Sequence, residues 1–160
     1  MKDKLMTLTP DKWGLLEELS EDNLVNIQGV RAAAQNLANK RMEVAEDYLK
    51  VAKQLLHQDM HDRSVISRAY YGMYHAVRAA VYIRMRLDVP EHKKLIKKFE
   101  KVLIKEYNDS TFGSYFEKWR SNRNWYEYNP LVQPSRGLCV QAINDCKNII
   151  EICKKLMEVS

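Results

Sequence analysis

Glycine and proline are both scarce in this sequence, which has 5 glycines and 4 prolines among 160 residues. The prolines fall where the spacing of apolar residues is interrupted, at Pro10, Pro90, Pro130 and Pro134. Because proline cannot continue a helix, we expect these positions to lie between helices. Internal repeats and low-complexity tracts are also lacking.

Long uncharged apolar runs are missing as well. No such run approaches the roughly 20 residues that a membrane-spanning helix requires, so we expect no membrane span. The sequence opens with Met1-Lys2-Asp3-Lys4 and continues with polar residues of mixed charge, without the apolar stretch of a secretory signal. We therefore expect a cytoplasmic protein.

Cysteine is limited to Cys139, Cys146 and Cys153, which are spaced seven residues apart. Metal sites usually pair ligands two to four residues apart, and a disulfide framework usually needs an even number of cysteines. A stripe with heptad spacing instead indicates reduced thiols buried along a packing seam. We expect no metal site and no cofactor.

The remaining bulk properties are those of one ordinary domain. The length is sufficient to bury a core without disulfides. Hydrophobic residues make up 46% of the chain and charged residues 29%, which argues against disorder. The formal net charge of +5 permits an anionic partner such as RNA but does not require one.

Apolar residues recur every three to four positions over most of the chain, which predicts amphipathic helices. We expect an all-α fold, an up-and-down bundle of about five helices. A bend or break is predicted around Asn36 to Lys40, because a single helix over 23–57 would be unusually long. The predicted helices run over 23–57, 64–86, 91–107, 112–126 and 139–157, after a short segment at 9–19 that is also expected to be helical.

The second of these helices carries the most informative stretch, Ser67 to Ala76, which reads SRAYYGMYHA. Arg68, Tyr71, His75 and Arg78 are spaced to share one helical face. On residues alone, the tyrosines are interpreted as the edges of a core and His75 as a partly buried histidine. A glycine in a helix interior, such as Gly72, lowers the stability of the helix by about 1 kcal/mol relative to alanine. We therefore expect another backbone to pack closely there.

The SRAYYGMYHA stretch closely resembles the second-helix signature S-R-A-Y-Y-A-x-F-H-A of prokaryotic HEPN domains. Residues 43–52 resemble the first helix of the same branch. The resemblance covers about 40–156 and implies a helical bundle that is usually dimeric. It leads us to divide the chain into an N-terminal helical extension, 1–39, and a HEPN-like bundle, 40–158.

Many HEPN proteins share a second motif, an arginine often followed by asparagine and, four to six residues later, by histidine. In ribonuclease members the motifs of two subunits face each other across a dimer cleft. They cleave RNA without metal, through attack of the 2′-hydroxyl. The reaction needs a group that transfers a proton and a cation that stabilises the phosphorane.

In this chain Arg123-Asn124 resembles the start of that motif, but no histidine follows it. The branch typically reads R-x-x-A-D-Y here, and Arg123, Glu127 and Tyr128 fall on its arginine, acidic and tyrosine positions. One interpretation is an intrahelical ion pair between Arg123 and Glu127. The other is a polar cleft in which Arg123 grips phosphate and Glu127 acts as the base, although a paired arginine would lower the pKa of that carboxyl group.

Other residues are candidates for the same cleft. His75 could supply the missing imidazole if the second helix faces the cleft, whereas His57, His61 and His92 are expected to be solvated. The aromatic residues Trp119, Trp125, Tyr126 and Tyr128 are expected either to stack on bases or to pack at a dimer seam. The candidates for nucleotide or RNA binding are Arg68, Tyr71, Arg78, Arg120, Asn124 and Tyr128.

Three functions remain open at this point. The resemblance implies a homodimeric module that binds a nucleotide or RNA and acts as the toxin-side partner of a minimal nucleotidyltransferase antitoxin. The first alternative is a metal-independent endoribonuclease centred on Arg123, with Glu127 or His75 as the proton-transfer group. The second alternative is a structural helical dimer without a ligand.

Overall fold

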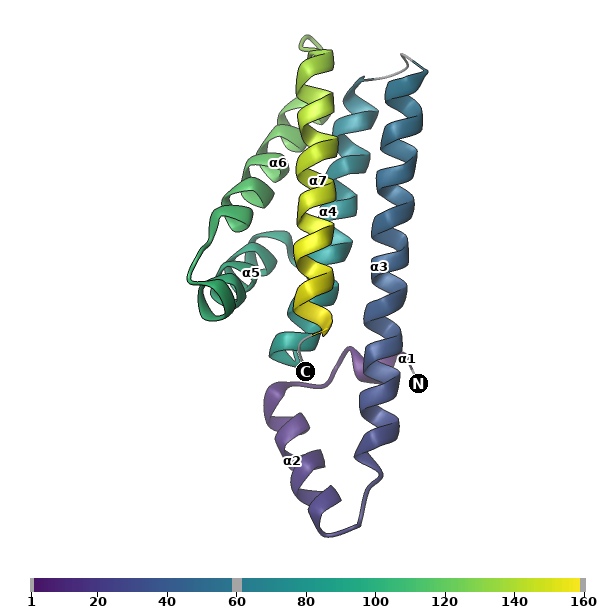
Figure 1. Ribbon diagram of the computed structural model, residues 1–160, viewed down its shortest axis with the longest axis vertical. Helices are drawn as coiled ribbons and strands as arrows, with labels where there is room; N and C mark the ends of the chain where they lie inside the picture. The colour runs from purple at the N-terminus through teal and green to yellow at the C-terminus, as the bar shows by residue number, and fades with distance from the viewer. Residues whose placement is uncertain (1, 59–61, 159–160) are drawn as a thin grey trace.

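The computed structural model describes residues 2–58 and 62–158 and contains only helices within those ranges. This confirms the all-α prediction. Two short helices precede five long ones (Figure 1). The helices are α1 (Lys2–Leu5), α2 (Pro10–Glu21), α3 (Ile27–His57), α4 (Asp62–Met85), α5 (His92–Tyr107), α6 (Thr111–Tyr128) and α7 (Arg136–Glu158).

The helices α3, α4, α6 and α7 run alternately up and down, and α5 lies at an angle near the lower end of α6 (Figure 1). The centre of the bundle is α4, which contacts α3, α5, α6 and α7. Its sequence is apolar on most sides, so it can bury residues against every neighbour. Full burial of one such aliphatic or aromatic side chain stabilises the fold by about 1.5–3 kcal/mol.

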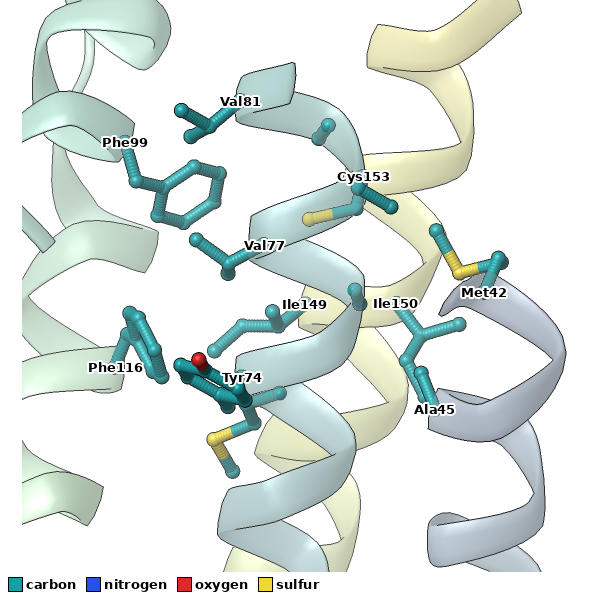
Figure 2. Close-up of a cluster of buried hydrophobic side chains, with 14 of the residues drawn as sticks. Met42, Ala45, Tyr74, Val77, Val81, Phe99, Phe116, Ile149, Ile150 and Cys153 are labelled. Carbon is teal, nitrogen blue, oxygen red and sulfur yellow. The ribbon is translucent and has the colours of Figure 1, made fainter. Parts of the chain in front are cut away.

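The core forms where these helices meet (Figure 2). Val77 and Val81 of α4 are fully buried there, as are Phe99 of α5 and Phe116 of α6. From the other side, α7 contributes Ile149 and Cys153. All three cysteines are free and buried, as the heptad spacing predicted. Burial raises the pKa of the Cys139 thiol to about 11 and that of Cys146 to about 12.

Of the bend or break predicted around Asn36 to Lys40, the break is wrong, because α3 continues through these residues as one helix of 31 residues. The physical reason is a continuous seam of buried residues on one face of α3, which the bundle holds against its neighbours. The seam includes Ala34, Ala38, Met42, Ala45, Leu49 and Ala52. The side chain of Asn26 caps the helix by accepting a hydrogen bond from the Gly29 amide at 3.3 Å.

Gly72 lies where α4 approaches both α3 and α7. A Cβ atom at this position would lie 2.8 Å from Sγ of Cys146 and 3.1 Å from the carbonyl oxygen of Ala45. The second distance confirms the close approach of another backbone that the sequence predicted. The small residue therefore sets the spacing of three helices beside the tyrosines.

The N-terminal segment folds against the lower end of the bundle. The helix predicted at Thr9 to Leu19 is present as α2, and its Trp13 is only 2% exposed. The Tyr82 hydroxyl of α4 donates a hydrogen bond to the Leu5 carbonyl at 3.3 Å. The division of the chain at residue 39 stays a prediction, and α3 runs across it.

Candidate nucleotide-binding cleft

The C-terminal half of α6 lies against the N-terminal half of α4 and brings Arg123 to Tyr71. Nη2 of Arg123 donates a hydrogen bond to the Tyr71 hydroxyl at 3.0 Å, and Nη1 donates to Oδ1 of Asn124 at 3.0 Å. The Nε side of the guanidinium forms the predicted ion pair with Glu127. Four of the sequence-predicted site residues therefore form one connected group.

Aromatic rings cover the faces of the same guanidinium. Its central carbon lies 5.4 Å from the centroid of the Tyr71 ring and 5.9 Å from that of Tyr128. Cation–π contacts of this kind hold an arginine in place without using its donors. Tyr128 is 75% exposed and the Arg123 side chain only 16%, so Tyr128 lies on the solvent side of the cation.

A cavity of about 270 Å³ adjoins this group, between the start of α4 and the end of α6. We call it the α4–α6 cleft, and its lining consists of Arg63, Ser64, Ser67, Arg68 and Glu127. Apart from Glu127, every lining side chain is a hydroxyl or a guanidinium. These are the donors that hold phosphate oxygens in proteins.

The two arginines of the cleft lining, Arg63 and Arg68, make different contacts. Arg63 donates hydrogen bonds to the carbonyls of Pro130 at 2.6 Å and Val132 at 2.9 Å, so it holds the loop that follows α6. Arg68 is exposed, and its guanidinium lies 5.7 Å from the centroid of the Tyr48 ring. Arg68 is therefore the lining arginine that can turn toward a ligand.

His92 was expected to be solvated, and this prediction is wrong. Its ring stacks on Tyr74 with a centroid distance of 4.4 Å, and its Nδ1 is hydrogen-bonded to the hydroxyl of the buried Tyr70. It also meets the edge of Tyr71, whose hydroxyl binds Arg123. The physical reason is that α5 begins directly after Pro90, whose carbonyl accepts a hydrogen bond from Tyr74 at 2.9 Å.

The environment of His92 favours the neutral imidazole. Burial lowers its pKa, and the positive charges of Arg123, Arg120 and Arg78 lower it further. The arginine motif places its histidine after the arginine, and His75 was the alternative on the second helix, so the sequence pattern did not single out His92. The signal that could have found it is the position of His92 in the first turn of a helix that must pack on the tyrosines of α4.

His75 lies on the opposite side of the tyrosine cluster. Its ring stacks on Tyr48 at a centroid distance of 5.5 Å and meets the edge of Tyr74 at 5.2 Å. Burial lowers its pKa, as do the charges of Arg78 and Arg41. No contact joins His75 to Arg123 within the described ranges. His57 is exposed at the end of α3, and His61 lies outside the described residues.

Arg78, predicted to bind RNA, is engaged in a buried ion-pair network. Its Nε and Nη2 donate to the two carboxylate oxygens of Asp88 at 2.8 and 2.7 Å, and Arg41 adds a third contact to Asp88 at 3.0 Å. Burial opposes ionisation of Asp88, but the two arginines outweigh it, so the pKa of Asp88 is lowered. No sequence motif singles out Arg41 or Asp88.

The remaining residues of α6 divide between core and surface. Trp119 is fully buried and donates from Nε1 to Asp145 at 2.8 Å, so the expectation that it stacks on bases or packs at a dimer seam is wrong. Trp125 is 57% exposed, whereas Tyr126 packs partly against the core. Arg120 donates to both carboxylate oxygens of Glu117, at 3.0 and 2.6 Å.

The part of the chain that the structure describes holds neither a metal-binding cluster nor a membrane-spanning helix. No group of three or more histidine, cysteine, aspartate or glutamate side chains is arranged to hold a metal ion. Among the described helices, none combines the length and the apolar character that crossing a bilayer requires.

An arginine of the penultimate helix is thus held by a tyrosine of the SRAYY helix inside an all-α bundle. The family model described as the HEPN domain matches residues 38–156, which is more than half of the chain. The chain therefore belongs to the HEPN domain family.

The chain is also similar to a relative that is named as a putative toxin. The chain is 29% identical over 118 residues to a protein of Methanocaldococcus jannaschii named "Putative toxin MJ0605". The aligned region covers 73% of this chain and 86% of the relative.

Proposed function

We propose that this HEPN protein is the toxin-side member of a two-component system and binds a nucleotide or RNA phosphate at the α4–α6 cleft. The observation that carries the proposal is the fixed position of Arg123, between Tyr71 and Glu127 at the edge of a cavity lined by serine and arginine side chains. The name of the M. jannaschii relative supports the toxin assignment.

The cleft offers a definite way to bind an anion. Glu127 occupies the outer edge of Arg123, and its own side chain is 42% exposed. A phosphate group that enters from the cavity can replace the Glu127 carboxylate on Arg123, because guanidinium binds carboxylate and phosphate with the same fork of donors. Arg68 and the hydroxyls of Ser64 and Ser67 would then complete the contacts.

The partner assignment rests on the family and on one surface. In the branch that the sequence resembles, the partner is a minimal nucleotidyltransferase that acts as antitoxin, and the HEPN protein forms a homodimer. Exposed apolar residues gather at the end of α6 and in the loop after it, with Trp125 57%, Tyr128 75% and Leu131 92% exposed. Exposed aromatic residues next to an arginine are typical of protein interfaces.

Growth of a bacterial host tests the toxin assignment. Expression of the wild-type chain is expected to slow growth, Arg123→Gln to restore it, and co-expression of a minimal nucleotidyltransferase antitoxin to restore it as well. Lys147→Gln serves as the control, because it removes one positive charge from an exposed position of α7. Equal growth with wild type and Arg123→Gln at equal protein levels would contradict the proposal.

A second candidate function is a metal-independent endoribonuclease, and the position of His92 favours it. Tyr71 contacts both Arg123 and His92, so a cation for the phosphorane and a largely neutral imidazole lie on two sides of one ring. In the alternative that the sequence indicated, Glu127 or His75 acts as the base of the endoribonuclease. In each version Arg123 stabilises the charge on the phosphorane.

Cellular RNA distinguishes the two functions. An endoribonuclease would produce RNA fragments in cells that express the wild type, and none with Arg123→Ala. The variants His92→Gln, His75→Gln and Glu127→Gln would each identify one candidate for the proton-transfer group. Slow growth with intact RNA would leave the binding module and eliminate the endoribonuclease.

A further inference from the structure

A second cavity, larger than the α4–α6 cleft, lies at the other end of the bundle. Its volume is about 500 Å³, and its lining comes from the first turns of α3 and the last turn of α4. In Figure 1 the first turns of α3 extend past the end of α7 toward α2. We call it the extension pocket, and it is lined by Gln28, Arg31, Ala32, Gln35, Ile83, Arg84 and Arg86.

The lining is strongly basic. It contains three arginines and two glutamines but no aspartate or glutamate. Two carboxylates approach the arginines from outside the pocket: Glu17 pairs with Arg31 at 2.9 Å, and Glu106 pairs with Arg84 at 3.6 Å. The first pair is about half exposed and the second is loose, so neither fully satisfies its guanidinium.

The guanidinium of Arg84 is incompletely hydrogen-bonded, which is the first observation that indicates a ligand. Its side chain is only 16% exposed, and its buried Nε has no hydrogen-bond partner among the described residues. A buried polar group without a partner costs about 1–3 kcal/mol, so native proteins rarely leave one without a reason. Because Nε itself is covered by protein atoms, a phosphate oxygen in the pocket would bind the terminal nitrogens of Arg84, whose carboxylate partner Glu106 lies 3.6 Å away.

Arg86 provides the second sign. Its backbone has a φ of 53°, the left-handed region that favours glycine at the end of a helix. An arginine at this position accepts backbone strain, and its guanidinium lies 4.8 Å from the centroid of the buried Trp13 ring. A cation–π contact does not occupy the N–H donors of the guanidinium, so they stay available to a ligand.

The spacing on α3 completes the pocket. Gln28, Arg31, Ala32 and Gln35 follow i, i+3, i+4 and i+7, so they form one face of the helix. Amide side chains can both donate to and accept from a base edge or a ribose hydroxyl. Ala32 and Ile83 add a small apolar surface between these polar groups.

We propose that the extension pocket binds a nucleotide through its phosphates, with Arg31, Arg84 and Arg86 holding the phosphate oxygens and Gln28 and Gln35 the nucleoside. The volume suits a ligand of that size. Three guanidiniums, each able to hold two phosphate oxygens, can engage more oxygens than a single phosphate monoester presents, so the preferred ligand carries a di- or triphosphate. The nucleotide can be free or the phosphorylated end of an RNA chain, since the recognised chemistry is the same.

Amide chemical shifts of the full-length wild-type protein test this without any variant. The probes are ATP, adenosine, inorganic tripolyphosphate and a single-stranded RNA dodecamer with a terminal triphosphate. ATP is expected to shift amides of 28–35 and 83–86, and a stronger effect of the RNA would identify the RNA end as the source. Shifts confined to 63–71 and 120–128, or tripolyphosphate binding as tightly as ATP, would overturn the proposal.

Two variants make the test specific. Arg31→Gln is expected to weaken ATP binding about tenfold, because it removes one charge-assisted contact from an exposed position. Glu17→Gln is expected to leave the affinity for ATP unchanged or to increase it, because it frees Arg31 from its competing carboxylate. Lys147→Gln is the charge control. Equal weakening by Arg31→Gln and Lys147→Gln would overturn the pocket assignment, whether or not the α4–α6 cleft binds RNA.

Discussion

The Tyr71 hydroxyl accepts a hydrogen bond at 3.0 Å from the Arg123 guanidinium, across 52 positions of the sequence. The contact joins the tyrosine-rich helix α4 to the helix that carries the arginine motif. Tyr71 also meets His92 edge-on, with a centroid distance of 6.5 Å. One phenol ring thus connects the cation of the candidate site with its only nearby imidazole among the described residues.

Removing the Tyr71 hydroxyl should weaken this connection without disturbing the core. Tyr71→Phe is expected to lower the free energy of unfolding by about 0.5–1.5 kcal/mol, the usual net value of one hydrogen bond. A double-mutant cycle with Arg123→Gln, measured by urea denaturation, isolates the pairwise part. If the effects of the two substitutions simply add, the contact contributes nothing to stability.

Gly72 should not tolerate even a methyl group. Gly72→Ala would place Cβ 2.8 Å from Sγ of Cys146 and 3.1 Å from the Ala45 carbonyl. We expect a loss of about 1–3 kcal/mol in unfolding free energy, as for other overpacked cores. Gly29→Ala is the matched control, because its Cβ would meet no atom within 4 Å, and it should instead stabilise α3 by up to about 1 kcal/mol.

The Asp88 network should be costly to break. Asp88→Asn leaves Arg41 and Arg78 without their shared carboxylate, and removing one partner of a buried pair costs about 3–5 kcal/mol. Chemical denaturation at neutral pH measures this loss. A loss below about 1 kcal/mol, the range of exposed ion pairs, would show that the network is not buried in solution.

The same carboxylate predicts a pH dependence. The pKa of Asp88 is lowered in the folded protein, so its contribution to stability is complete above the ordinary value of 3.8 and is lost as the pH falls through the folded-state value. Wild-type unfolding free energy is expected to fall in that acidic window. The decline attributable to Asp88 should be missing in Asp88→Asn, and parallel curves for the two proteins would contradict the assignment.

The two imidazoles of the tyrosine cluster should titrate below their ordinary value of 6.5. Because burial favours the neutral form, these two imidazoles take up protons at a lower pH in the folded protein than in the unfolded chain. Stability is therefore expected to decline as the pH falls below 6.5. Ring proton shifts of His75 and His92 report the midpoints directly, and a midpoint at or above 6.5 for His92 would place its ring outside the tyrosine cluster.

The fold was predictable because its signals are local. The apolar spacing of residues 27–57 and 136–158 is visible within a few turns, and the SRAYYGMYHA stretch identifies the central helix. The error in α3 arose from length alone: a helix of this length is uncommon, but the buried alanines at 34 and 38 keep it continuous against the bundle.

The site was predictable only in part, because its remaining members come from other helices. The pair of Arg123 and Glu127 lies within one helix, so its spacing was readable. His92 joins Tyr70 from 22 positions away, and Asp88 joins Arg41 through tertiary packing that no local pattern encodes. Trp119 had the appearance of a surface aromatic, and only the packing of α6 on α7 shows why it is buried.

The binding of a labelled single-stranded RNA dodecamer, followed by fluorescence anisotropy at low and high salt, tests the central claim most directly. If Arg123 holds phosphate, Arg123→Gln should weaken binding about tenfold and Glu127→Gln should strengthen it, while Lys147→Gln has little effect. Affinity should also fall as salt rises. Equal affinities for wild type, Arg123→Gln and Lys147→Gln would contradict the account.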